Sequence, residues 1–204
     1  MPTTAIRDAR RKDIITAARD LFSRKGYHGT TMPDIARAAG ISTGLIYYIF
    51  PSKEEILLAC CEDAVTIYRD VLERANTIAN PLERFDALVR ELYTLLDSTS
   101  KRLLIMYRDL STLKRETRQR ILGPIHRLDD YFVALFQEGQ QAGVFRPDMP
   151  QPRILAANVL GLGHLWALQK TWHFASNNID LETYISTQLA YFHAQLLHPP
   201  VEQA

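Results

Sequence analysis

The strongest constraint on the fold is the stretch of residues 31–53, in which helix start and stop signals follow one another closely. Thr31 and Asp34 stand three positions apart before a helical run, and this spacing predicts an N-terminal capping box. Gly40 follows the run and can adopt the left-handed conformation that ends a helix. Ser42 can then cap a second helix of about eight residues. The segment therefore predicts two short helices joined by a tight turn.

A third helix is predicted directly after these two. Pro51 ends the second helix, because proline has no backbone N–H to donate, and Ser52 with Glu55 predicts another capping box. A short helix held across another by a glycine-containing turn is the helix-turn-helix geometry, whose second helix enters the major groove of DNA. The pattern thus predicts a DNA-binding head with one reading helix.

The predicted reading helix carries groups that suit DNA. Its N-terminus has unpaired amides and the positive end of the helix dipole, and both favour a phosphate. Tyr47 and Tyr48 offer aromatic bodies with hydroxyl tips, although packing against neighbouring helices would also explain them. Ile46, Ile49 and Phe50 form an apolar stripe that we assign to the core. The predicted DNA-contacting residues are Thr31, Ser42, Thr43, Gly44, Tyr47, Tyr48 and Lys53.

Residues at fixed spacings run from about position 10 to position 57. They are Ile14-Ile15, Ala17-Ala18, Leu21-Phe22, Lys25-Gly26-Tyr27, Thr30-Thr31, Ile35-Ala36, Ala39-Gly40, Ser42, Gly44, Tyr47, Phe50, Ser52-Lys53 and Glu55. This pattern resembles the N-terminal signature of the TetR family of bacterial transcription regulators. The resemblance implies an all-α protein with a three-helix helix-turn-helix head and a six-helix C-terminal body for ligand binding and dimerisation.

The pattern of apolar residues beyond the head is helical throughout. We place the domain boundary after residue 53, which gives a DNA-binding domain over 1–53 and a ligand-binding and dimerisation domain over 54–204. Together with the three head helices, the body helices make the number expected of the family. The predicted body helices span residues 53–77, 81–98, 100–110, 115–142, 151–174 and 179–197.

Charge is distributed unevenly between the two predicted domains. Residues 1–53 hold nine Lys and Arg against four Asp and Glu, a net charge of +5, whereas residues 54–204 carry a net charge of −4. This asymmetry is expected if one end of the protein meets a polyanion. The extreme N-terminus is either a solvated arm or an arm that reaches the DNA; its cations are Arg7, Arg10, Arg11 and Lys12.

Composition limits the remaining possibilities. The chain has 204 residues with 47% apolar content, and no apolar run approaches the roughly twenty residues that a membrane-spanning helix needs. The start also lacks a signal-peptide core, so we expect neither a membrane nor a secreted protein. The adjacent cysteines Cys60 and Cys61 are typical of a reducing cytoplasm and offer no metal-ligand spacing. We expect no metal and no cofactor.

The body helices carry more apolar and aromatic residues than a single buried stripe requires. A tightly packed core explains each of them individually, but an apolar cavity with a few polar handles is the general form of a small-molecule site. The resemblance implies such a cavity, and the segment 107–113 is similar to that of family members that sense fatty acyl thioesters, although aromatics, steroids or drugs would also suit an apolar cavity. The candidate effector-binding residues are Met106, Tyr107, Leu110, Leu128, Phe132, Asn158, Leu162 and Trp166, with Tyr107 and Asn158 as handles.

The last two predicted helices have wide apolar surfaces. Packing within the core of one chain could explain these apolar surfaces. A symmetric four-helix contact between two copies explains their width better. The resemblance also implies a homodimer, which would set two reading helices about 34–36 Å apart on a palindromic operator. The residues behind this prediction include Gly161 and Gly163 and the face Leu181, Ile185, Leu189, Phe192 and Leu196.

The sequence favours a ligand-responsive repressor over three other classes of protein. Catalysis is disfavoured because Trp166 replaces the last glycine of a dinucleotide-like string that begins at Gly161, and His164 and His173 lack metal-ligand spacing. A constitutive DNA-binding protein without an effector remains the main alternative. A helical adaptor that has lost DNA binding is disfavoured by the basic head. The sequence thus predicts a non-enzymatic regulator that binds double-stranded operator DNA and a small apolar effector.

Overall fold

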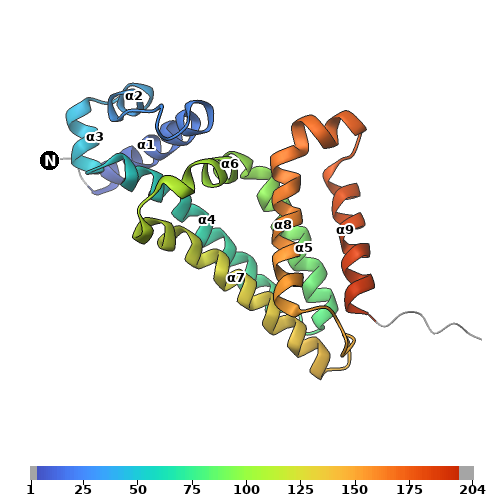
Figure 1. Cartoon of the computed structure of the whole chain (residues 1–204). Coiled ribbons are helices and arrows are strands. Elements are labelled where there is room, and N and C mark those ends of the chain that lie inside the picture. Colours follow the sequence, from blue (N-terminus) through green and yellow to red (C-terminus); the bar gives the residue numbers. More distant parts are fainter. Residues whose placement is uncertain (1–3, 198–204) are drawn as a thin grey trace, which may run out of the picture. The chain divides into compact units, whose positions relative to one another are not determined.

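The computed structural model describes residues 4–197, except for the side chains of residues 4–5, 62–67, 102, 106, 112 and 124. All regular elements in this range are helical, which confirms the predicted all-α class (Figure 1). No described helix is long and apolar enough to cross a membrane. The α-helices are α1 (Thr4–Lys25), α2 (Met32–Ala38), α3 (Thr43–Ile49), α4 (Lys53–Ala75), α5 (Pro81–Ser98), α6 (Ser100–Asp109), α7 (Arg115–Gln141), α8 (Pro152–Gln169) and α9 (Leu181–Leu196).

The predicted boundaries of the body helices agree with these to within a few residues, apart from one end. The helix predicted over 151–174 ends as α8 at Gln169 and continues as a π-helical segment, Lys170–Phe174, and a short 3-10 turn. Asn178 then takes a left-handed conformation with φ of 55° before α9 begins. Such π-helical segments depend on tertiary packing and leave little trace in the periodicity of the sequence.

The chain forms two compact units. The N-terminal unit consists of residues 1–66 with 101–123, and the C-terminal unit of residues 67–100 with 124–204. The first unit therefore contains α1 to α3 together with the start of α4, nearly all of α6 and the start of α7. The predicted domain boundary after residue 53 stays a prediction.

The core of the N-terminal unit is built on one face of α1. Ile14, Ala18 and Phe22 recur every four residues, so they lie on the same side of the helix and all are fully buried. α2 and α3 pack against this face and contribute Ile35 and Ile46 to the same cluster. This packing fixes the angle at which α3 is presented at the surface.

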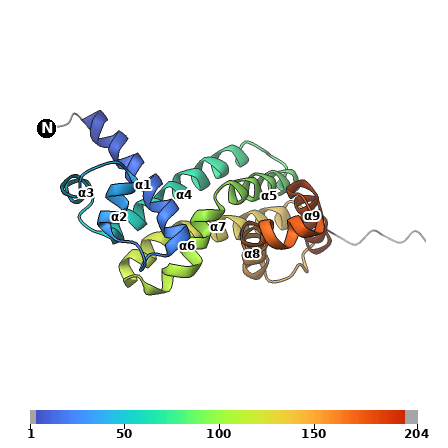
Figure 2. The same cartoon turned by 90° about the horizontal axis from the view of Figure 1, so that it is seen from above.

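The core of the C-terminal unit forms where α5 lies against α8 and α9 (Figures 1 and 2). Phe85 on α5 is fully buried, and its ring centroid lies 6.1 Å from that of Phe132, 5.8 Å from Phe136 and 5.7 Å from Phe192. Farther along α5, the Tyr93 hydroxyl donates to the Val159 carbonyl at 2.9 Å. Three helices are thereby joined around aromatic side chains of α5.

Gly163 allows α8 to approach α5 closely. A Cβ added there would lie 2.7 Å from Leu96 Cδ1 and 2.8 Å from Tyr93 Cε1. We predict that Gly163→Ala lowers the free energy of unfolding by about 1–3 kcal/mol, because the buried Tyr93 ring is held by its hydrogen bond and cannot yield. Urea denaturation measures the change.

The matched control for this substitution is Gly44→Ala. Nothing lies within 4 Å of a Cβ built on Gly44, and the residue lies inside α3. Alanine is favoured over glycine in a helix by about 1 kcal/mol, so this variant should be as stable as the parent protein or more so. Equal effects of the two substitutions would contradict the close approach at Gly163.

Candidate nucleic-acid interface

The start of α2 is fixed by the capping box that the sequence predicts. The Thr31 hydroxyl oxygen accepts a hydrogen bond from Asp34 N at 3.3 Å, and Thr31 N donates to Asp34 Oδ2 at 3.1 Å. The hydrogen bond from the Thr31 hydroxyl holds the pKa of the Asp34 carboxyl below its ordinary value. Thr31 is therefore a structural cap, and its predicted contact with DNA stays a prediction.

The reading helix α3 is capped by Ser42, whose Oγ accepts from Leu45 N at 3.2 Å. In the turn before α3, Gly40 has φ of +65°, which is the left-handed conformation expected of it. The third predicted cap is found in part, because Ser52 Oγ accepts from Glu55 N at 3.2 Å. The local signals in residues 31–55 thus produce the expected helix-turn-helix.

α3 has one buried and one exposed face. Ile46 and Ile49 are buried in the core, with Phe50 directly after them, as predicted. Tyr47 and Tyr48 point away from that core and remain 51% and 55% exposed. Large aromatic side chains exposed together on a short surface helix suit a binding surface better than a solvated one.

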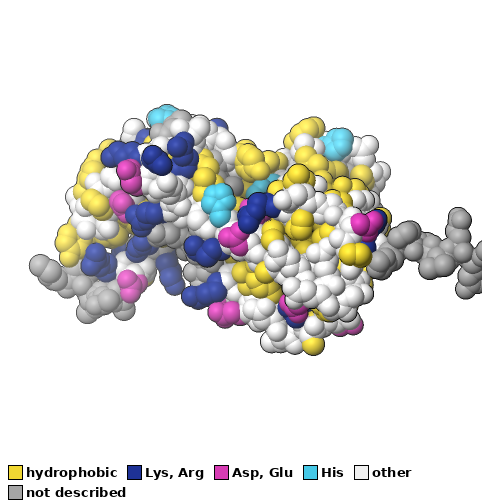
Figure 3. All heavy atoms as spheres, turned by 60° about the horizontal axis from the view of Figure 1, so that its bottom comes forward, with side chains coloured by type: hydrophobic (Ala, Val, Ile, Leu, Met, Phe, Trp, Pro, Cys, Tyr) yellow, Lys and Arg dark blue, Asp and Glu magenta, His cyan; other side chains and the backbone are white. Residues whose placement is uncertain are grey.

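Two arginines of α1 lie beside aromatic side chains at the C-terminal end of α3. The Arg7 guanidinium is 5.9 Å from the centre of the Tyr48 ring, and the Arg11 guanidinium is 4.8 Å from that of Phe50. These are distances at which a cation is attracted to a ring face. On the side drawn in Figure 3, Lys and Arg side chains gather over the N-terminal unit. The basic N-terminal residues are therefore part of α1 and flank the reading helix.

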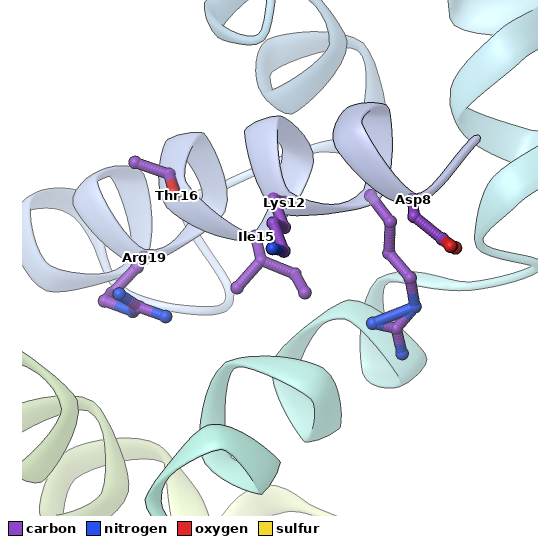
Figure 4. Close-up of a pocket in the computed structure, with 6 residues that line it drawn as sticks. Asp8, Lys12, Ile15, Thr16 and Arg19 are labelled. Atoms are coloured by element: carbon purple, nitrogen blue, oxygen red, sulfur yellow. The ribbon is translucent and has the colours of Figure 1, made fainter. Parts of the chain in front are cut away.

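A half-open hollow of about 550 Å³ runs along α1 (Figure 4). Its lining holds three cationic side chains and one carboxylate, and it adds positive charge to the same helix that flanks α3. The sequence did not single out this hollow, although its residues recur every three or four positions and so share a helix face. They are Asp8, Arg11, Lys12, Ile15, Thr16 and Arg19.

Lys53 has a role that the sequence did not reveal. Its Nζ donates to the backbone carbonyls of Tyr27 and Thr30, both at 2.7 Å, and lies 4.3 Å from the centre of the Tyr27 ring. Partial burial lowers the pKa of Lys53, and the charge of Asp109 opposes that shift. Lys53 thus ties α4 to the turn between α1 and α2, and its predicted contact with DNA stays a prediction.

The predicted effector residues are divided between the two units. In the N-terminal unit, Tyr107 is exposed and Leu110 is partly buried, while the side chain of Met106 lies outside the described residues. In the C-terminal unit, Leu128 and Phe132 are buried in the core. An effector site that draws on both groups stays a prediction.

The three remaining candidates lie on α8 and differ in exposure. Leu162 is partly buried. Asn158 and Tyr107, the two predicted polar handles, are both exposed in the single chain. Trp166 is buried: its Nε1 donates to Asp97 Oδ1 at 2.8 Å, and its ring stacks on Phe174 with 5.1 Å between centroids. Substitution of Trp166 would therefore change core packing whatever its role toward an effector.

The fold and the exposed reading helix define a helix-turn-helix DNA-binding protein of the all-α class. The family described as "Bacterial regulatory proteins, tetR family" matches residues 14–60, and the "Tetracyclin repressor-like, C-terminal domain" matches residues 79–167. The regulator HbdR of Aromatoleum sp. (strain CIB) is 30% identical over 183 residues, which cover 89% of this chain and 78% of the relative. The chain belongs to the TetR family and is a transcription regulator, not an enzyme.

Further relatives agree with this assignment. The repressor KstR2 of Mycobacterium tuberculosis (strain H37Rv) is 28% identical over 147 residues, which cover 70% of this chain and 72% of the relative. The crystal structure of AibR in complex with isovaleryl coenzyme A and operator DNA superimposes with a TM-score of 0.77 at 28% identity, covering 89% of this chain and 97% of AibR. A TetR-family protein from Rhodococcus RHA1 shares the fold, with a TM-score of 0.81 at 21% identity over 93% of this chain and 98% of that one.

Proposed function

We propose that the protein is a repressor that binds a palindromic operator as a homodimer, through α3 of each chain, and releases it when a small apolar effector binds the body. The observation that carries operator binding is the pair of exposed tyrosines on α3, with Arg7 of α1 beside Tyr48 and Arg11 beside the adjoining Phe50. Phosphate contacts from such cations position a protein on DNA, and α3 would read the base edges. Since its target is chromosomal DNA, the protein would act in the cytoplasm.

The exposed face of α8 supports dimerisation through the last two helices. Ile154, Asn158, Gly161 and Leu165 are all exposed and recur every three or four residues, so they form one stripe along the helix. Tyr191 adds an exposed aromatic side chain on α9. A stripe that includes large apolar residues and a glycine suits close packing against a second copy.

The inner face of α9 is buried in the core of the single chain. Four residues of the face that the sequence offered for dimerisation are buried within the single chain: Ile185, Leu189, Phe192 and Leu196. The proposed contact therefore uses the outer sides of α8 and α9 and leaves this inner face in place.

For the effector we propose an acyl thioester. AibR, a relative of 28% identity over most of both chains, was crystallised with isovaleryl coenzyme A and operator DNA. The proposed effector acts by preferring the conformation that does not bind DNA, since only differential affinity shifts such an equilibrium. Titration of a protein–operator complex with acyl thioesters of increasing chain length tests this. A protein–operator complex that no thioester dissociates would favour the alternative, a constitutive DNA-binding protein without an effector.

Tyr47→Ala tests the assignment of the reading helix. We expect a loss of operator affinity of about tenfold, or roughly 1.4 kcal/mol, because the side chain is exposed and its removal leaves the core of the head intact. Fluorescence anisotropy with labelled fragments from upstream of the gene measures the affinity. Tyr68→Ala, on α4 outside the head, is the control and should bind like the parent protein. Unchanged affinity in Tyr47→Ala would remove this residue from the interface.

A further inference from the structure

We infer that Arg108 and Asp109, at the end of α6, are positioning residues that hold the turn between α1 and α2 and thereby set the affinity for operator DNA. The turn consists of residues 26–31 and leads directly into α2 of the helix-turn-helix. The inference rests on the proposed operator binding. It assigns a function to two residues that belong neither to the predicted DNA-contacting residues nor to the candidate effector-binding residues.

The side chain of Asp109 binds the backbone of the turn. Its carboxylate is buried, with the residue only 4% exposed, and Oδ2 accepts a hydrogen bond from Tyr27 N at 3.2 Å. Arg108 donates to the same oxygen from Nη2 at 3.0 Å and from Nε at 3.3 Å. A buried carboxylate needs such partners to offset its loss of water, so its position is narrowly defined.

Arg108 binds the end of α1 next to the same turn. It donates to the carbonyls of Phe22 and Ser23 in the last turn of α1, and the Phe22 carbonyl also accepts from Gly26 N at 3.0 Å. Gly26 follows with φ of +80°, and a Cβ built there would lie 3.6 Å from Arg108 Cζ. The guanidinium therefore caps α1 and lies against the glycine at which the chain turns.

Lys53 holds the turn from α4 through the carbonyls of Tyr27 and Thr30. The backbone amide of Tyr27 is thus bound by α6 and its carbonyl by α4. Within the turn, Thr30 N donates to Tyr27 O at 3.3 Å, and the Thr30 hydroxyl donates to Gly26 O at 2.8 Å. A segment with so few bonds of its own takes its conformation from the groups that hold it.

A shift of the turn would change the position of α2 and α3. Because α2 begins at Met32, any shift of the turn moves the start of the helix-turn-helix. A displacement of the end of α6 would be felt in the head through Asp109 and Arg108, which would give a change in the body a defined route to the reading helix. Direct hydrogen bonds from the end of α6 to the end of α1 and to the turn would transmit such a displacement.

The test compares Asp109→Ala with Asp109→Asn in the full-length protein. We expect Asp109→Ala to bind operator about tenfold more weakly and to exchange the Tyr27 amide hydrogen faster. Asp109→Asn keeps an acceptor oxygen for Tyr27 N and should recover most of the affinity and the protection. Asp130→Ala removes an exposed carboxylate that pairs with Arg153 and should match the parent protein in both measurements.

All affinities are compared at a temperature where circular dichroism shows each variant folded. If Asp109→Ala does not fold, Arg108→Gln replaces it, since that side chain is only partly buried, and the same loss of affinity is expected. The inference is overturned if the folded variant binds operator like the parent protein, or if its affinity falls only in proportion to its folded fraction. A parent protein that binds no DNA would overturn the proposed function instead.

Discussion

Phe85→Ala should lower the free energy of unfolding by about 3–5 kcal/mol, a larger change in stability than we expect for Gly163→Ala. The side chain is fully buried, and three phenylalanine rings from α7 and α9 lie around it within 6.1 Å between centroids. Its removal would leave a cavity that the surrounding rings can fill only in part. Denaturation by urea, followed by circular dichroism, measures the change.

Tyr48→Ala is the matched control, because it removes an aromatic side chain from the surface. That side chain is 55% exposed, so the change in unfolding free energy should stay within about 0.5 kcal/mol. A loss below about 1.5 kcal/mol for Phe85→Ala would show that the aromatic cluster is not the centre of this core.

Gly44→Asp should weaken operator binding by about 100-fold while leaving the fold at least as stable. A Cβ at this position meets no atom within 4 Å, and a carboxylate in the first turn of α3 stabilises the helix by about 0.3–1 kcal/mol through the helix dipole. The same carboxylate would face DNA phosphates in the proposed complex, and placing like charges together across an interface costs several kcal/mol. Stability and affinity therefore change in opposite directions.

Gly44→Asn separates charge from size. Asparagine has nearly the shape of aspartate without its charge, so we expect it to retain most of the operator affinity. Anisotropy titrations of both variants, together with thermal denaturation, measure the two effects. If Gly44→Asp binds operator like the parent protein, the N-terminus of α3 does not face the DNA.

The parts of the head that the sequence predicted correctly depend on neighbouring residues. Caps at Thr31 and Ser42 and the left-handed Gly40 require partners only a few positions away, and each is found in the structure. Lys53 and Asp109 act over longer separations, since their partner Tyr27 lies 26 and 82 residues away in the chain. Periodicity and capping rules carry no information on such contacts.

The body shows the same difference between local and distant features. Helix periodicity predicted α5 to α9 because each buries an apolar face. It could not show that Trp166 would bind Asp97 on α5, or that Asn158 would be exposed on its own chain. A cavity depends on which faces of separate helices meet, so the effector residues could not be fixed from spacing alone.

In the proposed complex, two copies of this chain place α3 in successive major grooves of a duplex. The most direct measurement is a titration of a labelled palindromic fragment from the gene's upstream region with purified protein over a series of salt concentrations. We predict saturation at two chains per duplex and a logarithm of affinity that falls linearly with the logarithm of salt concentration. Failure to bind any double-stranded fragment at low ionic strength would contradict this prediction.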